Sequence, residues 1–550
     1  MKLSVLTLSA LLPSAFALWP LPTSYTNGTT PLRLSPFFDI KLNVHNAPAD
    51  LVAAVARAKG FLKTDKLQAL VVDRGASSAQ AISKAKTLPS LTISLNTNGA
   101  VKSISEEAIA PIDSRVESYT LTVPADGSGA VLKANSTLGL YRGLTTFGQL
   151  WYEWDGSTYS LSAPIQISDS PAYPYRGFMM DTARNYYPVE DILRTLDAMS
   201  WVKLNTLHWH IVDSQSFPLV IPGYTVLSEK GAYNAASVYT SADVKKVVAY
   251  AAARGIDVLP EIDTPGHTAV ISKAFPEYIA CNEATPWASF ANEPPAGQLR
   301  LADEKTSQFT AAMLKAVATM FPSTLFSTGG DEINQNCYTQ DTETQASLAA
   351  SNKTFLQALD TFTRVNHAAL RTEGKTAVVW EEMVLDNPVT LANDTLVLVW
   401  VSSANVAAVA ATGHRLVHAA SDYFYLDCGH GAWVGDFPTG NSWCDPFKSW
   451  QHAYTFDPVA NLTTTEADLV LGGQSLLWAE QSSRESLDAT IWPRAASTAE
   501  LFWSGPGGDV QKALPRLHEA VYRFRTRGVA ANALQPEWCA LRPGACDLTA

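Results

Sequence analysis

Residues 176–213 read RGFMMDTARNYYPVEDILRTLDAMSWVKLNTLHWHIVD, and this stretch decides the fold. Two short apolar runs, Arg176–Thr182 and Asn205–Val212, flank a segment with helical spacing, Val189–Lys203. Runs of this length and apolarity are typical of strands that are buried on both faces of a parallel sheet. The stretch therefore predicts a strand, a helix and a second, parallel strand.

The same alternation continues towards the carboxyl terminus. Helical stretches such as Ala242–Arg254, Thr306–Met320 and Thr354–Thr372 separate most of the later apolar runs. Eight such strands alternating with helices over about 330 residues predict a (β/α)₈ TIM barrel in the α/β class. A doubly wound open sheet is the alternative, but no G-x-G-x-x-G follows the first strand. The six later strands are expected at Ile256–Ile262, Leu325–Gly330, Thr376–Glu381, Thr395–Val401, Arg415–Ala420 and Leu469–Ala479.

Composition limits the classes of function. The chain has 550 residues, a formal charge of −12 and 47% hydrophobic residues, so we expect a folded protein of two to four domains. The acidic balance and the lack of a Lys/Arg run argue against a nucleic-acid partner. No internal stretch of 18 apolar residues is present, so no membrane partner is expected.

A smaller α+β domain is expected before the barrel. Residues 18–35 are rich in Pro, Thr and Ser and predict an extended lead-in, and Ser170–Tyr175 predicts a boundary. Between them we expect strands at Ala69–Asp73, Leu91–Leu95 and Glu117–Val123, and a helix within Thr137–Trp154. The predicted division is a signal peptide (1–17), the α+β domain (18–172), the barrel (173–505) and a helical tail packed on the barrel (506–550).

The first residues predict secretion. Met1–Ala17 carries one lysine, an apolar run and a small-x-small ending, which is typical of a cleaved signal peptide; a buried first strand is the alternative. Five Asn-x-Ser/Thr sequons and an even number of cysteines fit an oxidising, extracellular compartment. No C-x-x-C pair points to zinc, and the six cysteines allow fifteen connectivities. The sequons begin at Asn27, Asn135, Asn352, Asn393 and Asn461, and the cysteines are Cys281, Cys337, Cys428, Cys444, Cys539 and Cys546.

Polar and aromatic side chains gather at the carboxyl ends of the predicted strands, where TIM barrels place their active sites. Carboxylates beside tryptophans suit a sugar, because the indole stacks against the C–H face of the ring while carboxylates bind the hydroxyls. The residues are Asp181, His208, His210, Asp213, Glu261, Asp263, His267, Asp331, Glu332, Trp380, Glu381, Glu382, Trp400, Tyr423, Tyr425, Asp427, Trp478 and Glu480.

Six segments carry a resemblance to a known family. They are RGFMMDTARNYYP (176–188), NTLHWHIVDSQSFP (205–218), VLPEIDTPGHT (258–268), STGGDE (327–332), VVWEEM (378–383) and LLWAE (476–480). Together they resemble the β-N-acetylhexosaminidases of glycoside hydrolase family 20, in particular secreted fungal members. The resemblance covers about Arg176 to Trp503, and the preceding domain has the size of that family's non-catalytic domain.

The resemblance implies a retaining, substrate-assisted mechanism without a cofactor or metal. The substrate's 2-acetamido oxygen would attack its own anomeric carbon, giving an oxazolinium intermediate. Glu332 would be the general acid and base, with a raised pKa, and Asp331 would hold the acetamido group. Asp213 would orient His267, which would tune Glu332. Many relatives have a second carboxylate after the residue that matches Asp213, where this chain has Ser214.

The resemblance also implies a set of sugar-binding residues. Arg176 would hold sugar hydroxyls, although a salt bridge at the base of the barrel is the alternative. Tyr425 would hydrogen-bond the acetamido oxygen, with Asp427 beside it, and Glu480 would bind the hydroxyls at positions four and six. The remaining implied residues are Trp380, Trp400 and Trp478, for which barrel packing is the alternative.

The expected activity is the exo-acting removal of terminal non-reducing β-linked N-acetylglucosamine, with N-acetylgalactosamine tolerance left open. Chitooligosaccharides and glycoconjugates such as N-glycan ends both present that sugar, and homodimers are common in the family. Nearest-neighbour order together with the family's pattern implies the disulfides Cys281–Cys337, Cys428–Cys444 and Cys539–Cys546.

Two other functions remain as alternatives. His208-x-His210 at a strand end is a pattern by which barrel metallohydrolases bind a metal, although that reading needs further His or Cys ligands. A non-catalytic carbohydrate-binding protein would keep the aromatic residues but would not need Asp331 and Glu332 beside His267.

Overall fold

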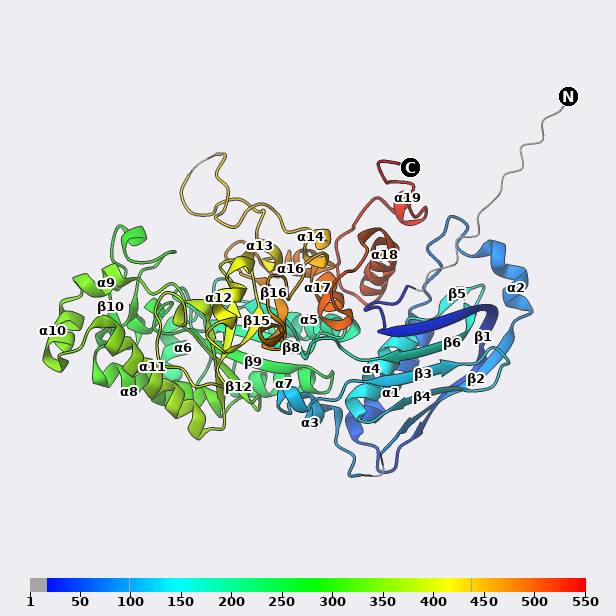
Figure 1. Cartoon of the computed structure of the whole chain (residues 1–550), viewed down its shortest axis with the longest axis horizontal. Coiled ribbons are helices and arrows are strands. Elements are labelled where there is room, and N and C mark those ends of the chain that lie inside the picture. Colours follow the sequence, from blue (N-terminus) through cyan, green and yellow to red (C-terminus); the bar gives the residue numbers. More distant parts are fainter. Residues whose placement is uncertain (1–16, 98, 437) are drawn as a thin grey trace.

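The computed structural model describes residues 17–97, 99–436 and 438–550, so the predicted signal peptide lies almost entirely outside the described residues. Figure 1 shows the amino-terminal domain beside the barrel, with the carboxyl-terminal helix α18 (Val510–Thr526) lying where the two meet. Among the described residues no helix is both long and apolar enough to span a membrane.

The amino-terminal domain is a curled mixed sheet with helices packed against it (Figure 1). The strand order is β1-β2-β4-β3-β6-β5, and β1 also pairs with β6 because its first half runs antiparallel to β6 and its second half parallel to β2. Its elements are β1 (Ser24–Asn43), α1 (Ala49–Thr64), α2 (Ala79–Ser83), β2 (Lys86–Leu95), α3 (Ile104–Ala108), β3 (Tyr119–Val123), β4 (Ala130–Ala134), α4 (Thr137–Gly148), β5 (Tyr152–Trp154) and β6 (Ser157–Asp169).

One of three expectations for this domain needs correction, and the structure adds detail to the other two. The extended segment predicted at residues 18–35 includes the start of β1, where most residues from Ser24 to Pro31 are exposed. Residues 69–73 form a bend and a turn and not a strand. The helix predicted within Thr137–Trp154 is confirmed as α4, and Tyr152–Trp154 after it forms β5. The apolar run at residues 69–72 is compatible with a strand and with a turn, so the sequence alone did not distinguish the two.

The barrel prediction is confirmed. Eight parallel strands close in the order β7-β8-β9-β12-β13-β14-β15-β16, with β16 pairing back to β7. Their bounds are β7 (Tyr175–Asp181), β8 (Thr206–Val212), β9 (Asp257–Ile262), β12 (Leu325–Gly329), β13 (Thr376–Trp380), β14 (Leu396–Val399), β15 (Arg415–His418) and β16 (Val470–Leu477). The covering helices include α5 (Val189–Trp201), α7 (Ser241–Ala252), α8 (Glu304–Ala318), α11 (Phe355–Thr372), α12 (Val406–Ala410) and α17 (Arg494–Ser504).

Buried ion pairs join the amino-terminal domain to the amino ends of the barrel strands. Glu117 lies between Arg142 of α4 and Arg176 of β7, at 2.7 Å from each. Lys203 Nζ lies 2.8 Å from Asp169 Oδ2, and both side chains are fully buried. These pairs fix the barrel's base against the smaller domain and leave the opposite rim open for chemistry.

A short strap, residues 17–23, ties the start of the described chain to the barrel and the tail. The indole of Trp19 donates to the carbonyl of Ala496 at 2.7 Å, and Arg516 of α18 lies over its ring. Arg516 also pairs with Glu500 of α17 at 2.6 Å. The predicted packing of the tail on the barrel therefore includes a buried ion pair.

Candidate active site

A sharp turn after β12 presents two adjacent carboxylates at the rim. Gly329 and Gly330 have φ values of +68° and +101°, and Glu332 itself has φ +51°. A Cβ on Gly329 would overlap the carboxylate of Asp263, so this position requires glycine. The turn places Asp331 inside the rim and turns Glu332 towards His267.

Asp213, His267 and Glu332 form a row. His267 Nδ1 lies 3.1 Å from Asp213 Oδ1, and its Nε2 lies 3.4 Å from Glu332 Oε2 and 3.7 Å from Asp331 Oδ2. Burial alone would lower the pKa of His267, but the charges of Asp213 and Asp331 outweigh it and raise that pKa well above its usual value. The imidazole is therefore a cation that bridges Asp213 and the acid pair.

The expectation of a raised pKa for Glu332 is wrong for this structure. Burial acts to raise it, but the hydrogen bond and the positive charge of His267 win and lower the pKa of Glu332. The proton therefore lies on the imidazole, next to the carboxylate that would need it.

Asp331 behaves in the opposite way, because a second carboxylate faces it. Burial and the neighbouring Asp263 raise the pKa of Asp331 well above its usual value, and burial raises that of Asp263 to about 7. Asp331 Oδ1 and Asp263 Oδ2 are both buried without a donor group from the described protein residues. The pair thus holds a proton readily and has an acceptor to offer to a ligand.

Four aromatic side chains line the space beside Asp331. Trp380 lies between Trp400 and Trp478, with ring centroids 6.5 and 6.3 Å away, and Tyr425 stacks nearly parallel to Trp400 at 6.2 Å. Glu382 accepts from Trp400 Nε1 at 2.8 Å, and burial raises the pKa of Glu382 to about 9. A neutral carboxyl group therefore fixes Trp400 in this aromatic cluster, which is the candidate sugar pocket.

Asp427 and Glu480 lie on the side of the pocket formed by Trp478. The backbone N–H of Trp478 donates to Asp427 Oδ1 at 3.4 Å, and burial raises the pKa of Asp427 to about 7. Burial also raises the pKa of Glu480 well above its usual value, although Arg184 opposes this shift. Tyr423, another predicted rim residue, stacks its ring on His452 at 4.1 Å.

The assignment of Arg176 to sugar binding is wrong. Its side chain is fully buried at the amino end of β7, where it pairs with Glu117 and donates to the carbonyls of Lys203 and Tyr173. Arg176 is therefore a structural arginine near the amino end of β7, which the smaller domain covers. The salt bridge at the base, the alternative reading, is what the structure shows.

Arg184 is the arginine at the rim, and the sequence interpretation missed it. Its guanidinium contacts Asp181, Asp213 and Glu293 at 3.2, 3.0 and 2.6 Å and lies over the ring of Trp478 at 5.0 Å. The signal was present in the same quoted segment, since Arg184 follows Asp181 at the carboxyl end of the strand. Asp263 and Glu382 stood among the rim residues, but nothing in the sequence gave them a role.

The two histidines of the metal alternative are fully engaged. His208 contacts Gln474 through Nδ1 and Glu261 through Nε2, and His210 contacts Glu261 through Nδ1 and Asp213 through Nε2. A metal bound by both His208 and His210 would have to displace some of these contacts, whereas His210, Glu261 and Asp263 do bring possible ligand atoms within 4.8 Å of one another.

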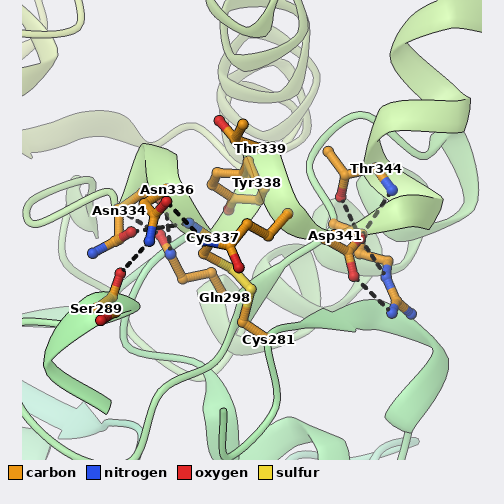
Figure 2. Close-up of a disulfide and its surroundings, with 12 residues drawn as sticks. Cys281, Ser289, Gln298, Asn334, Asn336, Cys337, Tyr338, Thr339, Asp341 and Thr344 are labelled. Carbon is orange, nitrogen blue, oxygen red and sulfur yellow. Dashed lines mark hydrogen bonds and ion pairs between the residues drawn. A yellow bond between two sulfur atoms is a disulfide. The ribbon is translucent and has the colours of Figure 1, made fainter. Parts of the chain in front are cut away.

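The six cysteines pair as the resemblance implied. Cys281–Cys337 joins the loop after β9 to α9 (Gln335–Gln340), with the Cα atoms 5.8 Å apart, and Figure 2 shows the polar contacts around it. Asn334 caps α9, and Asn336 donates to the carbonyl of Ser289 (Figure 2). The chain just after Glu332 is therefore tied to the loop that follows β9. The other pairs are Cys428–Cys444 and Cys539–Cys546.

The asparagines of the five predicted sequons are all exposed, so each is accessible for glycosylation.

Ser214, the departure from many relatives, is buried. Its backbone N–H donates to Asp213 Oδ1 at 2.5 Å, and its hydroxyl accepts from Ala269 N at 3.4 Å. It thus supports Asp213 without adding a charge.

Comparisons with known proteins agree with this geometry. A family model described as "Glycosyl hydrolase family 20, catalytic domain" matches residues 173–506, and one described as "beta-acetyl hexosaminidase like" matches residues 18–150. A chitooligosaccharidolytic β-N-acetylglucosaminidase of Bombyx mori is 34% identical over 96% of this chain and 89% of its own. A β-hexosaminidase of Arthroderma benhamiae is 36% identical over 78% of this chain and 74% of its own.

Solved structures show the same architecture. A chitobiase of Flavobacterium johnsoniae superposes with a TM-score of 0.74 at 25% identity, covering 94% of this chain and 73% of that one. An exo β-N-acetylglucosaminidase of Vibrio harveyi, solved with N-acetylglucosamine, also gives 0.74, at 23% identity and over 94% and 78% of the two chains.

Proposed function

Because the chain belongs to glycosyl hydrolase family 20, we propose that it is an exo-acting β-N-acetylhexosaminidase. It would remove terminal non-reducing β-linked N-acetylglucosamine by a retaining, substrate-assisted reaction. Its family membership, two-domain fold and aromatic pocket beside adjacent acidic residues support this function.

The observation that carries the mechanism is the divergence of Asp331 and Glu332. A simple retaining glycosidase needs two carboxylates on opposite sides of the scissile bond, about 5–5.5 Å apart, and neighbours on one turn do not offer that arrangement. Here Glu332 faces His267, while Asp331 faces Asp263 and keeps one buried oxygen without a donor. That oxygen suits the N–H of an acetamido group, whose own oxygen would then be the nucleophile.

In this proposal Glu332 protonates the leaving oxygen and later activates water. His267 and Glu332 share the necessary proton, which rests on the imidazole and moves to Glu332 when a bound sugar excludes water. Asp213 keeps the His267 ring in place. Asp331 orients the acetamido group and stabilises the positive charge that develops on it.

Sugar binding is assigned to the pocket residues, with Arg184 in the role first given to Arg176. Arg184 would hold ring hydroxyls together with Glu480, while Tyr425 and Asp427 would bind the acetamido side. The indoles of Trp380, Trp400 and Trp478 would enclose the acetamido methyl group and support the ring.

Short chitooligosaccharides are the substrates we favour among those with this terminal sugar. Trp443 is 67% exposed, and its ring meets those of Trp400 and Tyr425 edge to face at 5.7 and 5.8 Å. It therefore extends the aromatic surface beyond the pocket, where the next sugar of a chain would lie. N-acetylgalactosaminides and N-glycan ends are the other substrates to compare.

We further propose that the protein is secreted, with residues 1–17 removed, residues 18–172 and 173–505 as its two domains and 506–550 as the tail. Three disulfides and five exposed sequons support passage through the secretory pathway. A homodimer, common in the family, is proposed on that ground alone.

The experiment is a comparison of three substrates with the purified protein. We expect turnover of chitobiose and of an aryl β-N-acetylglucosaminide, almost none of the matching aryl β-glucoside, and inhibition by a GlcNAc thiazoline that mimics the bicyclic intermediate. Equal turnover of the two aryl glycosides, or a covalent adduct on a carboxylate after treatment with a 2-deoxy-2-fluoro glycoside, would contradict the substrate-assisted proposal. Activity that is lost with a chelator would point to the metal alternative.

A further inference from the structure

A ladder of buried polar side chains lines the inside of the barrel beneath the acid pair. At its lower end Tyr175 donates its hydroxyl hydrogen to Gln474 Oε1 at 2.7 Å, and Gln474 Nε2 lies 3.1 Å from His208 Nδ1. His208 Nε2 in turn lies 3.0 Å from Glu261 Oε2, which also accepts from Ser327. None of these side chains is part of the sugar pocket.

The ladder continues upward through His210 to the active site. His210 Nδ1 lies 2.5 Å from Glu261 Oε1, and its Nε2 lies 2.7 Å from Asp213 Oδ2. Asp213 is the residue that holds His267. His210 and Glu261 are 1% and 0% exposed, so water does not screen these contacts.

Hydrogen-bond direction assigns a different charge to each histidine. Gln474 accepts from Tyr175 with its oxygen and so donates its N–H to His208, whose Nδ1 must then be an acceptor. His208 is therefore neutral and donates through Nε2. Both nitrogens of His210 face carboxylate oxygens, which only accept, so both must carry hydrogen and His210 must be an imidazolium.

Charged groups surround His210 on the neighbouring elements. Glu261 of β9 and Asp213 contact it directly, and Asp263 lies near Glu261 and His210. Arg184 Nη2 lies 3.0 Å from the same Asp213 oxygen that His210 contacts. Asp181 of β7 is its backbone neighbour in the sheet, and the edge of the Trp478 ring packs at 4.9 Å. Burial opposes the charged ring, but the two bonded carboxylates raise the pKa of His210 to about 10.

We propose that His210 is a positioning residue of the reaction: a buried, permanently charged imidazolium that fixes Asp213 and, through Asp213, the ring of His267 beside Glu332. The inference rests on the proposed function of Glu332, which His210 itself does not contact. The buried side chains below His210, from Tyr175 to Glu261, help to keep both nitrogens of His210 protonated.

A fixed positive charge beneath the site has a predictable electrostatic effect. The cations of His210, His267 and Arg184 all interact with the one negative charge of Asp213. The charge of His210 therefore limits how strongly Asp213 holds the proton of His267. Removal of a buried positive charge raises the pKa of the titrating groups coupled to it. The proton used by Glu332 would then be lost at a higher pH.

The test uses two substitutions on the same face of β8. His210→Gln replaces a cation by a neutral group, whereas His208→Gln replaces a neutral group by a neutral group at a site that also contacts Glu261. In chitobiose hydrolysis we expect His210→Gln to lower kcat and to move the alkaline limb of kcat/KM upward by roughly 0.5–1 pH unit. His208→Gln should lower thermal stability and leave that limb in place.

An unchanged alkaline limb in His210→Gln, or the same displacement in both variants, would overturn the proposal. If wild type hydrolyses none of the substrates, the proposed function fails, and the charge state of His210 is still open to measurement. The nitrogen chemical shifts of ¹⁵N-histidine-labelled wild type measure the protonation of each histidine directly, and they do not depend on whether a variant folds. Of the ten histidines, two, His210 and His267, should remain doubly protonated at pH 8.5 by their nitrogen shifts, and fewer than two would refute the inference.

Discussion

The two ends of the barrel bury charged side chains in opposite ways. At the base, Glu117 lies between two arginines, which lower its pKa to about 2 against the effect of burial. At the rim, Asp331 faces Asp263, and Glu381 and Glu382 are buried with pKa values raised to about 7 and about 9. The charges at the base are paired and structural, whereas Glu381 and Glu382 at the rim are buried against neutral groups, which is typical of a site prepared for a ligand.

The largest expected effect is on chemistry at the rim. Glu332→Gln removes the proposed acid, and general acid–base catalysis contributes about 10²–10⁴-fold, so chitobiose hydrolysis should fall by at least that factor. An aryl glycoside with a good leaving group needs less protonation and should lose less in its first step. Steady-state rates on both substrates check this, and near wild-type turnover of chitobiose would remove Glu332 from its role.

Replacing each of the two arginines by methionine, one at a time, tests the comparison between the base and the rim. Arg184→Met should lower kcat/KM severely in the molecules that are folded, because it removes the rim cation beside Asp213 and Glu293, and it should also lower stability because buried Asp213 loses a partner. Arg176→Met should instead cost about 3–5 kcal/mol of unfolding free energy, because Glu117 loses a buried partner. Denaturant unfolding and kinetics at a temperature where both variants are folded separate the two effects. A kinetic defect without loss of stability in Arg176→Met would restore the original assignment.

A substitution at the rim should separate activity from stability. Asp331→Asn removes one of two facing carboxylates, so we expect strongly reduced turnover with an unfolding free energy at pH 7 that is equal to or above that of wild type. The matched control at the base is Glu117→Gln, which should be less stable and catalytically normal per folded molecule. Thermal unfolding of the two variants side by side gives the answer, and a destabilised Asp331→Asn would contradict the picture of a strained rim.

Stability should depend on pH with opposite signs at the two ends. The folded-state pKa of Glu117 lies below its unfolded value, so its contribution is present above about pH 4.5 and is lost as the pH falls towards 2. The folded-state pKa of Glu381 lies above its unfolded value, so its contribution is present below about pH 4.5 and is lost as the pH rises towards 7. The thermal midpoint should therefore be highest between about pH 4.5 and 6. A midpoint that rises steadily to pH 8 would contradict this balance.

The smallest expected effect lies outside the pocket. Trp443→Ala should raise KM for chitooligosaccharides by about 5-fold, because an aromatic contact is worth about 1 kcal/mol. An aryl N-acetylglucosaminide, which places no second sugar there, should be hydrolysed as by wild type. Equal changes on both substrates would mean that Trp443 supports the walls of the pocket and does not bind the next sugar.

The sequence by itself determined the barrel, because apolar strands alternating with amphipathic helices have few other ways to bury their faces. It also placed Asp331, Glu332, His267 and Asp213 at one rim, since parallel strands bring their carboxyl ends together. The GGDE turn and the PGHT segment were specific enough to name a family. Residues 69–73 were misread because a short apolar run also occurs in a turn, where Leu70 is buried while Val71 and Val72 are exposed.

Only the tertiary structure decided what each charged side chain faces. Arg176 and Arg184 stand eight residues apart in one segment, and burial against Glu117 or beside Asp213 gave them opposite roles. The protonation of Glu332, of the Asp331–Asp263 pair and of His210 likewise followed from partners on other strands. The physical reason is that a pKa depends on distances of a few ångströms and on exclusion of water, neither of which is written in the order of residues.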